Sequence, residues 1–216
     1  MKKHHKETFE KIPEVKQQRI LNAAIQEFAA KGFQSANINI IAKNAEISIG
    51  SMYNYFESKE DLFLTVIDLG YRILERVLDD VDLQEGDVFD KLETLLRAAQ
   101  KYSKEFPELN QIYLDLTSEG LSHLSGELSH TVESITARYY RSLITEAKQL
   151  GQVAHDIDEN IASFCIDNIL LLFQYSFTSK YFNERMKIFV GETALTDNER
   201  MIDHIMKFIR RALSPR

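Results

Sequence analysis

Apolar residues recur every three or four positions along most of the 216-residue chain, which is the spacing of helices that bury one face. The first such run follows residue 14 and places Ile20, Ala24 and Phe28 on one side. Gly32 comes directly after this run and is well placed to end the helix. The polar residues 1–13 in front of it are expected to be frayed.

Two short helices joined by a tight turn are predicted next. Asn37 can cap a helix over 38–43, because its side-chain oxygen can accept a hydrogen bond from the first-turn amides. Ser48 can cap a second helix over 49–55 in the same way, and Phe56 is spaced to pack inward. The segment therefore predicts a helix-turn-helix.

Longer helices are predicted for the remainder of the chain. The Phe106-Pro107 pair should interrupt one of them, because proline lacks an N–H donor and restricts the residue before it. Capping patterns and breakers give these expected helices: Ser58 to Leu78, Asp87 to Glu105, Pro107 to Gly120, Leu124 to Leu150, Asp158 to Phe182, and Arg200 to Leu213 after the capping box Thr196-Asp197-Asn198-Glu199. The total is nine helices without a strand, so an all-α fold is expected.

The net charge of −7 by itself argues against a nucleic-acid partner, but the charges are unevenly distributed. Residues 1–60 carry nine Lys or Arg against seven acids, whereas the remaining residues carry 17 against 26. This asymmetry is what we expect when only the N-terminal end meets DNA.

Export and membrane insertion are not expected. The basic N-terminus is not followed by an apolar stretch, and the apolar run 161–177 is interrupted by Asp167 and Asn168. Cys165 is the only cysteine and is flanked by Phe164 and Ile166, so an inert core thiol in a reducing cytoplasm is expected. We therefore expect a cytoplasmic protein.

An ordered set of residues in the N-terminal third resembles the DNA-binding domain of the TetR family of transcriptional regulators. The set spans about residues 14–74 and reads Arg19-Ile20-Leu21-x-Ala23-Ala24-x-x-x-Phe28-x-x-x-Gly32-Phe33, then Ile41-Ala42-x-x-Ala45-x-Ile47-Ser48-x-Gly50-x-Met52-Tyr53-x-Tyr55-Phe56-x-Ser58-Lys59-x-x-Leu62. The resemblance implies a three-helix DNA-binding domain at 14–74, with its helix-turn-helix at 37–56. It also implies a larger helical domain at 75–216 for effector binding and dimerisation.

The same resemblance implies a recognition helix that enters the major groove, where base edges carry a distinguishable pattern. Gly50 would allow a close backbone approach, and Lys59 would contact a phosphate. The expected DNA-binding residues are Asn37, Asn39, Ser48, Ile49, Gly50, Ser51, Tyr53, Asn54, Tyr55 and Lys59.

Two positions leave alternatives open. Tyr53 could instead be a core aromatic that exposes only its hydroxyl. Glu46 departs from the family pattern, which usually has glycine in this tight turn. A positive φ at Glu46 would cost on the order of 1 kcal/mol.

The C-terminal half is expected to dimerise, and the resemblance to the family implies that it also holds an effector pocket. A single recognition helix covers few base pairs, so useful affinity requires two copies. The apolar helices near 158–182 and 200–213 would form the dimer interface by resemblance to the family, although both could simply be buried in a monomer. Candidate effector-binding residues combine aromatic walls with polar tips: Tyr102, Phe106, Tyr113, Leu116, His123, Tyr139, Tyr140, Phe164 and Asn168.

The expected function is a ligand-responsive repressor that binds an inverted-repeat operator as a homodimer and is released by a small apolar or amphipathic effector. The alternatives are an activator of the same family and a helical interaction protein that does not bind DNA. The segment 120–126 superficially resembles a nucleophile elbow but lacks glycine at position 124 and a strand before it, so an enzyme is not expected. The histidines show no HExxH pattern, and neither a metal nor a cofactor is expected.

Overall fold

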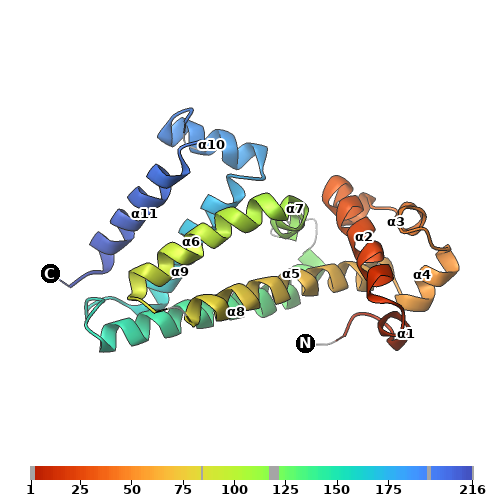
Figure 1. The fold of residues 1–216 in the computed structure, drawn as a ribbon, viewed down its shortest axis with the longest axis horizontal. Coiled ribbons are helices and arrows are strands. Elements are labelled where there is room, and N and C mark those ends of the chain that lie inside the picture. Colours follow the sequence, from red (N-terminus) through yellow and green to blue (C-terminus); the bar gives the residue numbers. More distant parts are fainter. Residues whose placement is uncertain (1–2, 84, 117–121, 194–195, 216) are drawn as a thin grey trace. The chain divides into compact units, whose positions relative to one another are not determined.

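The computed structural model describes residues 3–83, 85–116, 122–193 and 196–215, with the side chains of 122–132 left aside. Within these ranges the chain forms eleven helices and no strand, which confirms the predicted all-α class (Figure 1). The chain divides into two compact units. Unit 1 comprises Met1–Ile73 with Glu108–Ser125, and unit 2 comprises Leu74–Pro107 with Gly126–Arg216.

Unit 1 is built mainly from the N-terminal helices. These are α1 (Glu7–Glu10), α2 (Glu14–Ser35), α3 (Ile38–Asn44), α4 (Ile49–Tyr55), the first part of α5 (Lys59–Asp82), and α7 (Pro107–Leu116). The predicted boundaries follow local chemistry. Gly32 has φ 68° and breaks the helical path inside α2, and the Ser58 hydroxyl accepts a hydrogen bond from the Asp61 amide at 3.0 Å at the start of α5.

The core of unit 1 is aromatic and aliphatic. Phe28 and Phe63 meet edge to face with ring centroids 5.0 Å apart, and Phe33 lies 4.9 Å from Phe63. The largest fully buried side chains here are Ile20, Phe28, Ile41, Met52, Phe56, Leu62, Phe63 and Ile112. Because they come from several helices, this core holds the short helices α3 and α4 against the longer ones.

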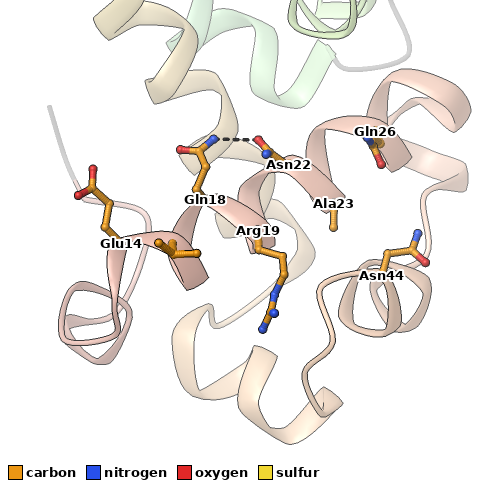
Figure 2. A pocket seen from close by; sticks show the side chains of 8 residues that line it. Glu14, Gln18, Arg19, Asn22, Ala23, Gln26 and Asn44 are labelled. Atoms are coloured by element: carbon orange, nitrogen blue, oxygen red, sulfur yellow. Dashed lines mark hydrogen bonds between the residues drawn. The ribbon is translucent and has the colours of Figure 1, made fainter.

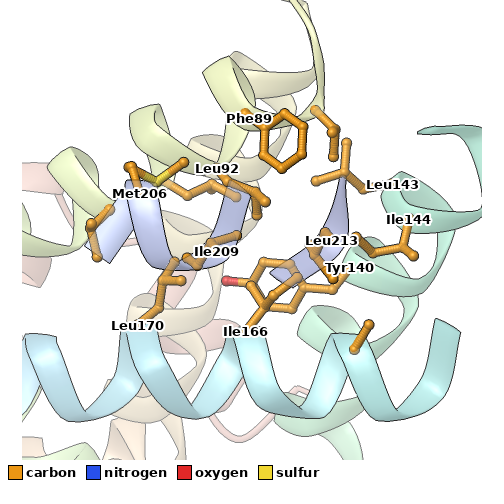
Figure 3. Packing of buried hydrophobic residues seen from close by; sticks show 14 of the residues in the cluster. Phe89, Leu92, Tyr140, Leu143, Ile144, Ile166, Leu170, Met206, Ile209 and Leu213 are labelled. Atoms are coloured by element: carbon orange, nitrogen blue, oxygen red, sulfur yellow. The ribbon is translucent and has the colours of Figure 1, made fainter. Parts of the chain in front are cut away.

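Unit 2 contains the rest of α5 with α6 (Val88–Glu105), α8 (Ser122–Gln149) from Gly126 onward, α9 (Glu159–Tyr175), α10 (Lys180–Val190) and α11 (Asn198–Leu213). Helix α6 packs against both α9 and α11. In Figure 3 the labelled side chains converge between these helices: Phe89, Leu92, Tyr140, Leu143, Ile144, Ile166, Leu170, Met206, Ile209 and Leu213. Predicted N-caps at Asp87 and Asp158 are confirmed by their hydrogen bonds to first-turn amides.

Four expectations about the helices and their boundaries were wrong. The structure has eleven helices in its described residues rather than nine. Residues 7–10 form α1 instead of a frayed end, because Phe9 is buried. The single helix expected over 158–182 ends at Tyr175, and the Ser179 hydroxyl caps a separate helix, α10. Asp197 rather than Thr196 caps α11.

Helix α9 is less enclosed than expected. Its buried face carries Ala162, Ile166, Leu170 and Phe173, and Cys165 lies outside that set. Cys165 is exposed, so the expectation of a core thiol was wrong. No single helix in the described part of the chain is long and apolar enough to span a membrane; α9 and α10 pass the length and composition test only as a pair, which is bent by 108°.

Candidate nucleic-acid interface

The turn between α3 and α4 is tight and is held by backbone hydrogen bonds. The Glu46 amide donates to the Lys43 carbonyl at 3.0 Å, and the Ile47 amide donates to the Ala42 carbonyl at 3.0 Å. Glu46 takes φ 52°, the left-handed region in which a side chain is unfavourable. The positive φ considered from the sequence is therefore present, and Glu46 keeps the turn geometry that glycine would adopt without strain.

The side chain of Glu46 is used in a second way. Its carboxylate accepts a hydrogen bond from the Arg19 guanidinium at 2.8 Å. Both side chains are largely exposed, so the pair adds little stability. It does link the tight turn to α2 from outside the core.

Helix α4 has two distinct faces. Met52 and Tyr55 are buried in the core of unit 1, whereas Ile49, Gly50, Tyr53 and Asn54 are exposed. Tyr53 has 47% of its surface exposed, which excludes the core alternative for this residue within the chain. The exposed set forms a surface that a major groove could accept.

Tyr55 does not belong to that surface, so the expectation that it contacts DNA is corrected. It is only 8% exposed, and its ring lies 5.9 Å from the ring of Phe9. Its hydroxyl accepts a hydrogen bond from Lys16 Nζ at 3.1 Å. Residues 52, 55 and 56 share one helix face by their i, i+3, i+4 spacing, which was the signal in the sequence that we missed.

Two candidate residues act as helix caps. The Asn37 Oδ1 accepts from the Asn39 amide at 2.9 Å, and the Ser48 hydroxyl accepts from the Ser51 amide at 3.0 Å. The Asn37 amide donates in turn to Glu27 at 3.1 Å. These caps fix where α3 and α4 begin, and they leave the exposed Asn39 side chain available on the surface.

Lys59 is held in place rather than freely solvated. Its Nζ donates to the carbonyls of Gln34 and Ala36 at 3.0 and 3.1 Å and lies 4.8 Å from the centre of the Phe33 ring. The ammonium group therefore binds carbonyls at the C-terminal end of α2. Its expected phosphate contact stays a prediction.

The N-terminal segment contacts α4, which the sequence did not lead us to expect. Lys6 and Thr8 donate hydrogen bonds to carbonyls at the end of α4, and Phe9 is 3% exposed. Phe9, a large apolar residue among the mostly polar residues 1–13, was the signal in the sequence that could have predicted this contact.

A surface groove of about 570 Å³ lies along α2 beside α3. It is lined by Glu14, Val15, Gln18, Arg19, Asn22, Ala23, Gln26 and Asn44. Figure 2 shows the side chains that line it, with Gln18 donating to Asn22 at 2.8 Å. None of the candidate effector-binding residues lines it.

The candidate effector-binding residues fall in both units. Tyr113 and Leu116 belong to unit 1, and most of the others belong to unit 2, where Tyr102 stacks on Phe106 at 5.8 Å and Tyr139 meets Tyr140 at 5.8 Å. The side chain of His123 lies outside the described residues. Phe164 is 68% exposed in this chain, and its expected contact with the effector stays a prediction. Asn168 donates to the Phe164 carbonyl at 2.7 Å.

Ionisable groups between α8 and α9 have perturbed pKa values. Burial and, to a smaller extent, the nearby Glu133 raise the pKa of Asp167 to about 6, although a hydrogen bond from Thr136 acts to lower it. Burial also raises the pKa of Tyr140 and that of Tyr175, with Asp167 adding to both effects. Unit 2 therefore contains a partly buried acidic and phenolic cluster near the predicted effector-binding residues.

One face of α9 presents large apolar side chains outward. Ile161, Phe164 and Leu172 are exposed, and their spacing places them along one side of the helix. On α11, Phe208 is exposed as well. Exposed apolar surface of this kind on two helices of one unit is typical of protein interfaces.

Comparison with known proteins identifies the fold and the family of the DNA-binding domain. The family model described as "Bacterial regulatory proteins, tetR family" matches residues 20–66. The fatty acid metabolism regulator protein of Bacillus subtilis is 26% identical over 152 residues, which cover 68% of this chain and 75% of that protein. The regulator UidR of Escherichia coli is 28% identical over 148 residues, covering 67% of this chain and 72% of UidR.

Solved structures share the fold over nearly the whole chain. A TetR family transcriptional regulator from Chloroflexus aurantiacus has a TM-score of 0.69 and 23% identity, and covers 98% of this chain and 99% of its own. FadR from Bacillus subtilis in complex with stearoyl-CoA has a TM-score of 0.71 and 18% identity, and the match covers 89% of this chain and 96% of the FadR chain. Together with the exposed face of α4, these matches show a TetR family DNA-binding domain at residues 20–66, in a chain that has the fold of the TetR family transcriptional regulators it resembles.

Proposed function

We propose that this DNA-binding transcriptional regulator is a repressor that binds an inverted-repeat operator with the exposed face of α4. The observation that carries the proposal is the exposure of Ile49, Gly50, Tyr53 and Asn54 on a capped helix whose other face is buried. Side chains on such a rigid helix can reach base edges in the major groove. Lys59 and Asn39 are proposed phosphate contacts at the edge of this surface.

The operator-binding form is proposed to be a homodimer. A seven-residue recognition helix contacts only a few base pairs, so a second copy about one helical turn away is needed for specificity. The apolar face of α9 with Phe208 of α11 would bury its exposed side chains against the same face of a second copy. This surface is the proposed dimer interface.

The effector is proposed to be a small apolar or amphipathic molecule that binds the C-terminal domain, 75–216. The proposal is supported by the aromatic candidates in unit 2 and by two relatives, the fatty acid metabolism regulator of B. subtilis and the FadR structure that holds stearoyl-CoA. Binding would release DNA if the effector prefers a conformation in which the two recognition helices no longer match the operator spacing.

Binding to DNA upstream of the protein's own gene tests the function. We expect sequence-specific, salt-sensitive binding that is weakened by stearoyl-CoA and unaffected by free coenzyme A, because only the former carries the acyl chain. A transcription assay with the same promoter distinguishes repression from activation. Absence of specific binding with and without effector would favour an interaction protein that does not bind DNA.

A further inference from the structure

The recognition helix α4 is short, and its C-terminal end needs partners. It has seven residues, and helices of this length are unstable in isolation. The last four carbonyls of a helix have no amide donor within the helix. Those of Met52, Tyr53, Asn54 and Tyr55 must therefore accept hydrogen bonds from donors outside it. The Phe56 amide satisfies the Met52 carbonyl at 2.9 Å.

The other three carbonyls accept hydrogen bonds from the N-terminal segment, residues 4–10. The Lys6 Nζ donates to the Tyr53 carbonyl at 3.0 Å, and the Thr8 hydroxyl donates to the Asn54 carbonyl. The Lys6 amide donates to the Tyr55 carbonyl at 2.8 Å. The partial negative charge at the C-terminal end of the helix dipole also stabilises the Lys6 ammonium group at this position.

The N-terminal segment is itself anchored to the core of unit 1. The Phe9 ring lies 4.9 Å from the Phe56 ring and 5.9 Å from the Tyr55 ring, and the His5 ring lies 5.3 Å from that of Phe9. The hydroxyl of the buried Thr65, on α5, lies 2.7 Å from the Asp61 carbonyl and 3.1 Å from the His4 carbonyl, and its one proton is shared between these two acceptors. The segment thus joins the end of α4 to α5.

We infer that the N-terminal segment is a positioning element for the recognition helix, and that Lys6, Thr8 and Phe9 set the specificity of DNA binding without themselves reading bases. The segment closes the C-terminal end of α4 as Ser48 closes its N-terminal end. Fixing both ends holds Tyr53 and Asn54 at a defined angle to the groove. The DNA part of this inference rests on the proposed function, whereas the structural part does not.

Hydrogen exchange tests the structural part without DNA. In Phe9→Ala, the amides of α4 are expected to exchange faster while those of α2 stay as in the wild type, and Phe9→Leu is expected to restore slow exchange by refilling the site. Equal acceleration of α2 and α4 would mean that Phe9 only supports global stability, and unchanged exchange of α4 would mean that the segment does not hold it. Either result overturns the inference.

Binding to a duplex selected from random DNA by the wild-type chain tests the specificity part. In Lys6→Gln and Phe9→Ala, the ratio of specific to non-specific affinity is expected to fall about tenfold, the order of effect of losing a helix cap. Lys11→Gln removes the same charge as Lys6→Gln from an exposed side chain whose ion pair is with Glu7, and should leave the ratio unchanged. If Lys6→Gln and Lys11→Gln lower both affinities equally, the lysine acts only through its charge and the inference is wrong. If the wild type selects no duplex, the proposed function fails, and the exchange measurement still decides whether the segment positions α4.

Discussion

Glu46 keeps its backbone in the left-handed region although it has a side chain. At φ 52° a residue with a Cβ is strained by about 1 kcal/mol relative to glycine, and the exposed ion pair with Arg19 offsets little of it. The deviation from the family pattern therefore changes the energy of the turn and not its conformation. Arg19 also gives the turn a link to α2 that glycine could not make.

Replacing Glu46 separates the backbone effect from that of the ion pair. Both Glu46→Gly and Glu46→Ala remove the carboxylate, but only glycine relieves the left-handed strain. We expect the glycine variant to have the higher free energy of unfolding by about 1 kcal/mol, measured by urea denaturation. Equal stability of the two variants would show that the turn is not strained.

Tyr53 and Tyr55 show what residue type alone cannot decide. Both are tyrosines in the same helix, and the sequence motif supports a DNA role for both. Burial distinguishes them. Tyr55 is buried and packs on Phe9, which also contacts Phe56, whereas Tyr53 is exposed to solvent. The position of Phe9 depends on tertiary contacts between residues about 46 apart, which local sequence patterns do not report.

At the scale of elements, the predictions that succeeded rest on local chemistry. Caps at Asn37, Ser48, Asp87 and Asp158 and the break at Gly32 depend only on neighbouring residues, so they could be identified in the sequence. The end of α9 could not, because residues 176–179 contain neither glycine nor proline. The Ser176 hydroxyl instead bonds back to the Leu172 carbonyl at 2.8 Å as the helix turns into α10.

Helix α9 carries a carboxyl group whose titration should affect stability. Because the pKa of Asp167 is raised from 3.8 to about 6, the folded chain keeps this proton at pH values where the unfolded chain has lost it. The associated stabilisation is complete below the unfolded pKa and is lost as the pH rises through the folded pKa. Asp167 therefore favours the folded state less at pH 7 than at pH 4.

Urea denaturation of the wild type and Asp167→Asn between pH 4 and pH 7 measures this effect. The difference in unfolding free energy between asparagine variant and wild type should grow in favour of the variant as the pH rises, because asparagine carries no charge to bury. A difference that does not vary with pH would place Asp167 in a more solvated setting than α8 and α9 provide.

The exposed apolar face of α9 predicts the response of the oligomeric state to charge. Phe164→Glu places a carboxylate in the proposed interface, and we expect it to shift the dimer toward monomer in light scattering at micromolar concentration. Phe189→Glu is the matched control, since Phe189 is also exposed but lies on α10. If only the Phe189→Glu control dissociates the dimer, the interface lies on α10 rather than on α9.

At the scale of the whole molecule, the proposed tasks of DNA binding and effector sensing fall in different units. Unit 1 holds the exposed face of α4 and nearly all of the family motif, which is why DNA binding could be predicted from the sequence. Unit 2 holds most of the candidate effector-binding residues, whose arrangement depends on packing between helices distant in sequence. Sequence patterns therefore indicated the sensing role only by resemblance.

The central claim is that the exposed face of α4 reads a specific DNA sequence. Fluorescence binding of the wild type and Tyr53→Ala to a duplex selected by the wild type, and to a scrambled duplex of equal length, tests it most directly. Tyr181→Ala is the control because Tyr181 is an exposed tyrosine on α10. The account predicts that Tyr53→Ala loses preference for the selected duplex, keeps its weak binding to the scrambled one, and stays folded, while Tyr181→Ala binds as the wild type. Undiminished preference in Tyr53→Ala would contradict it.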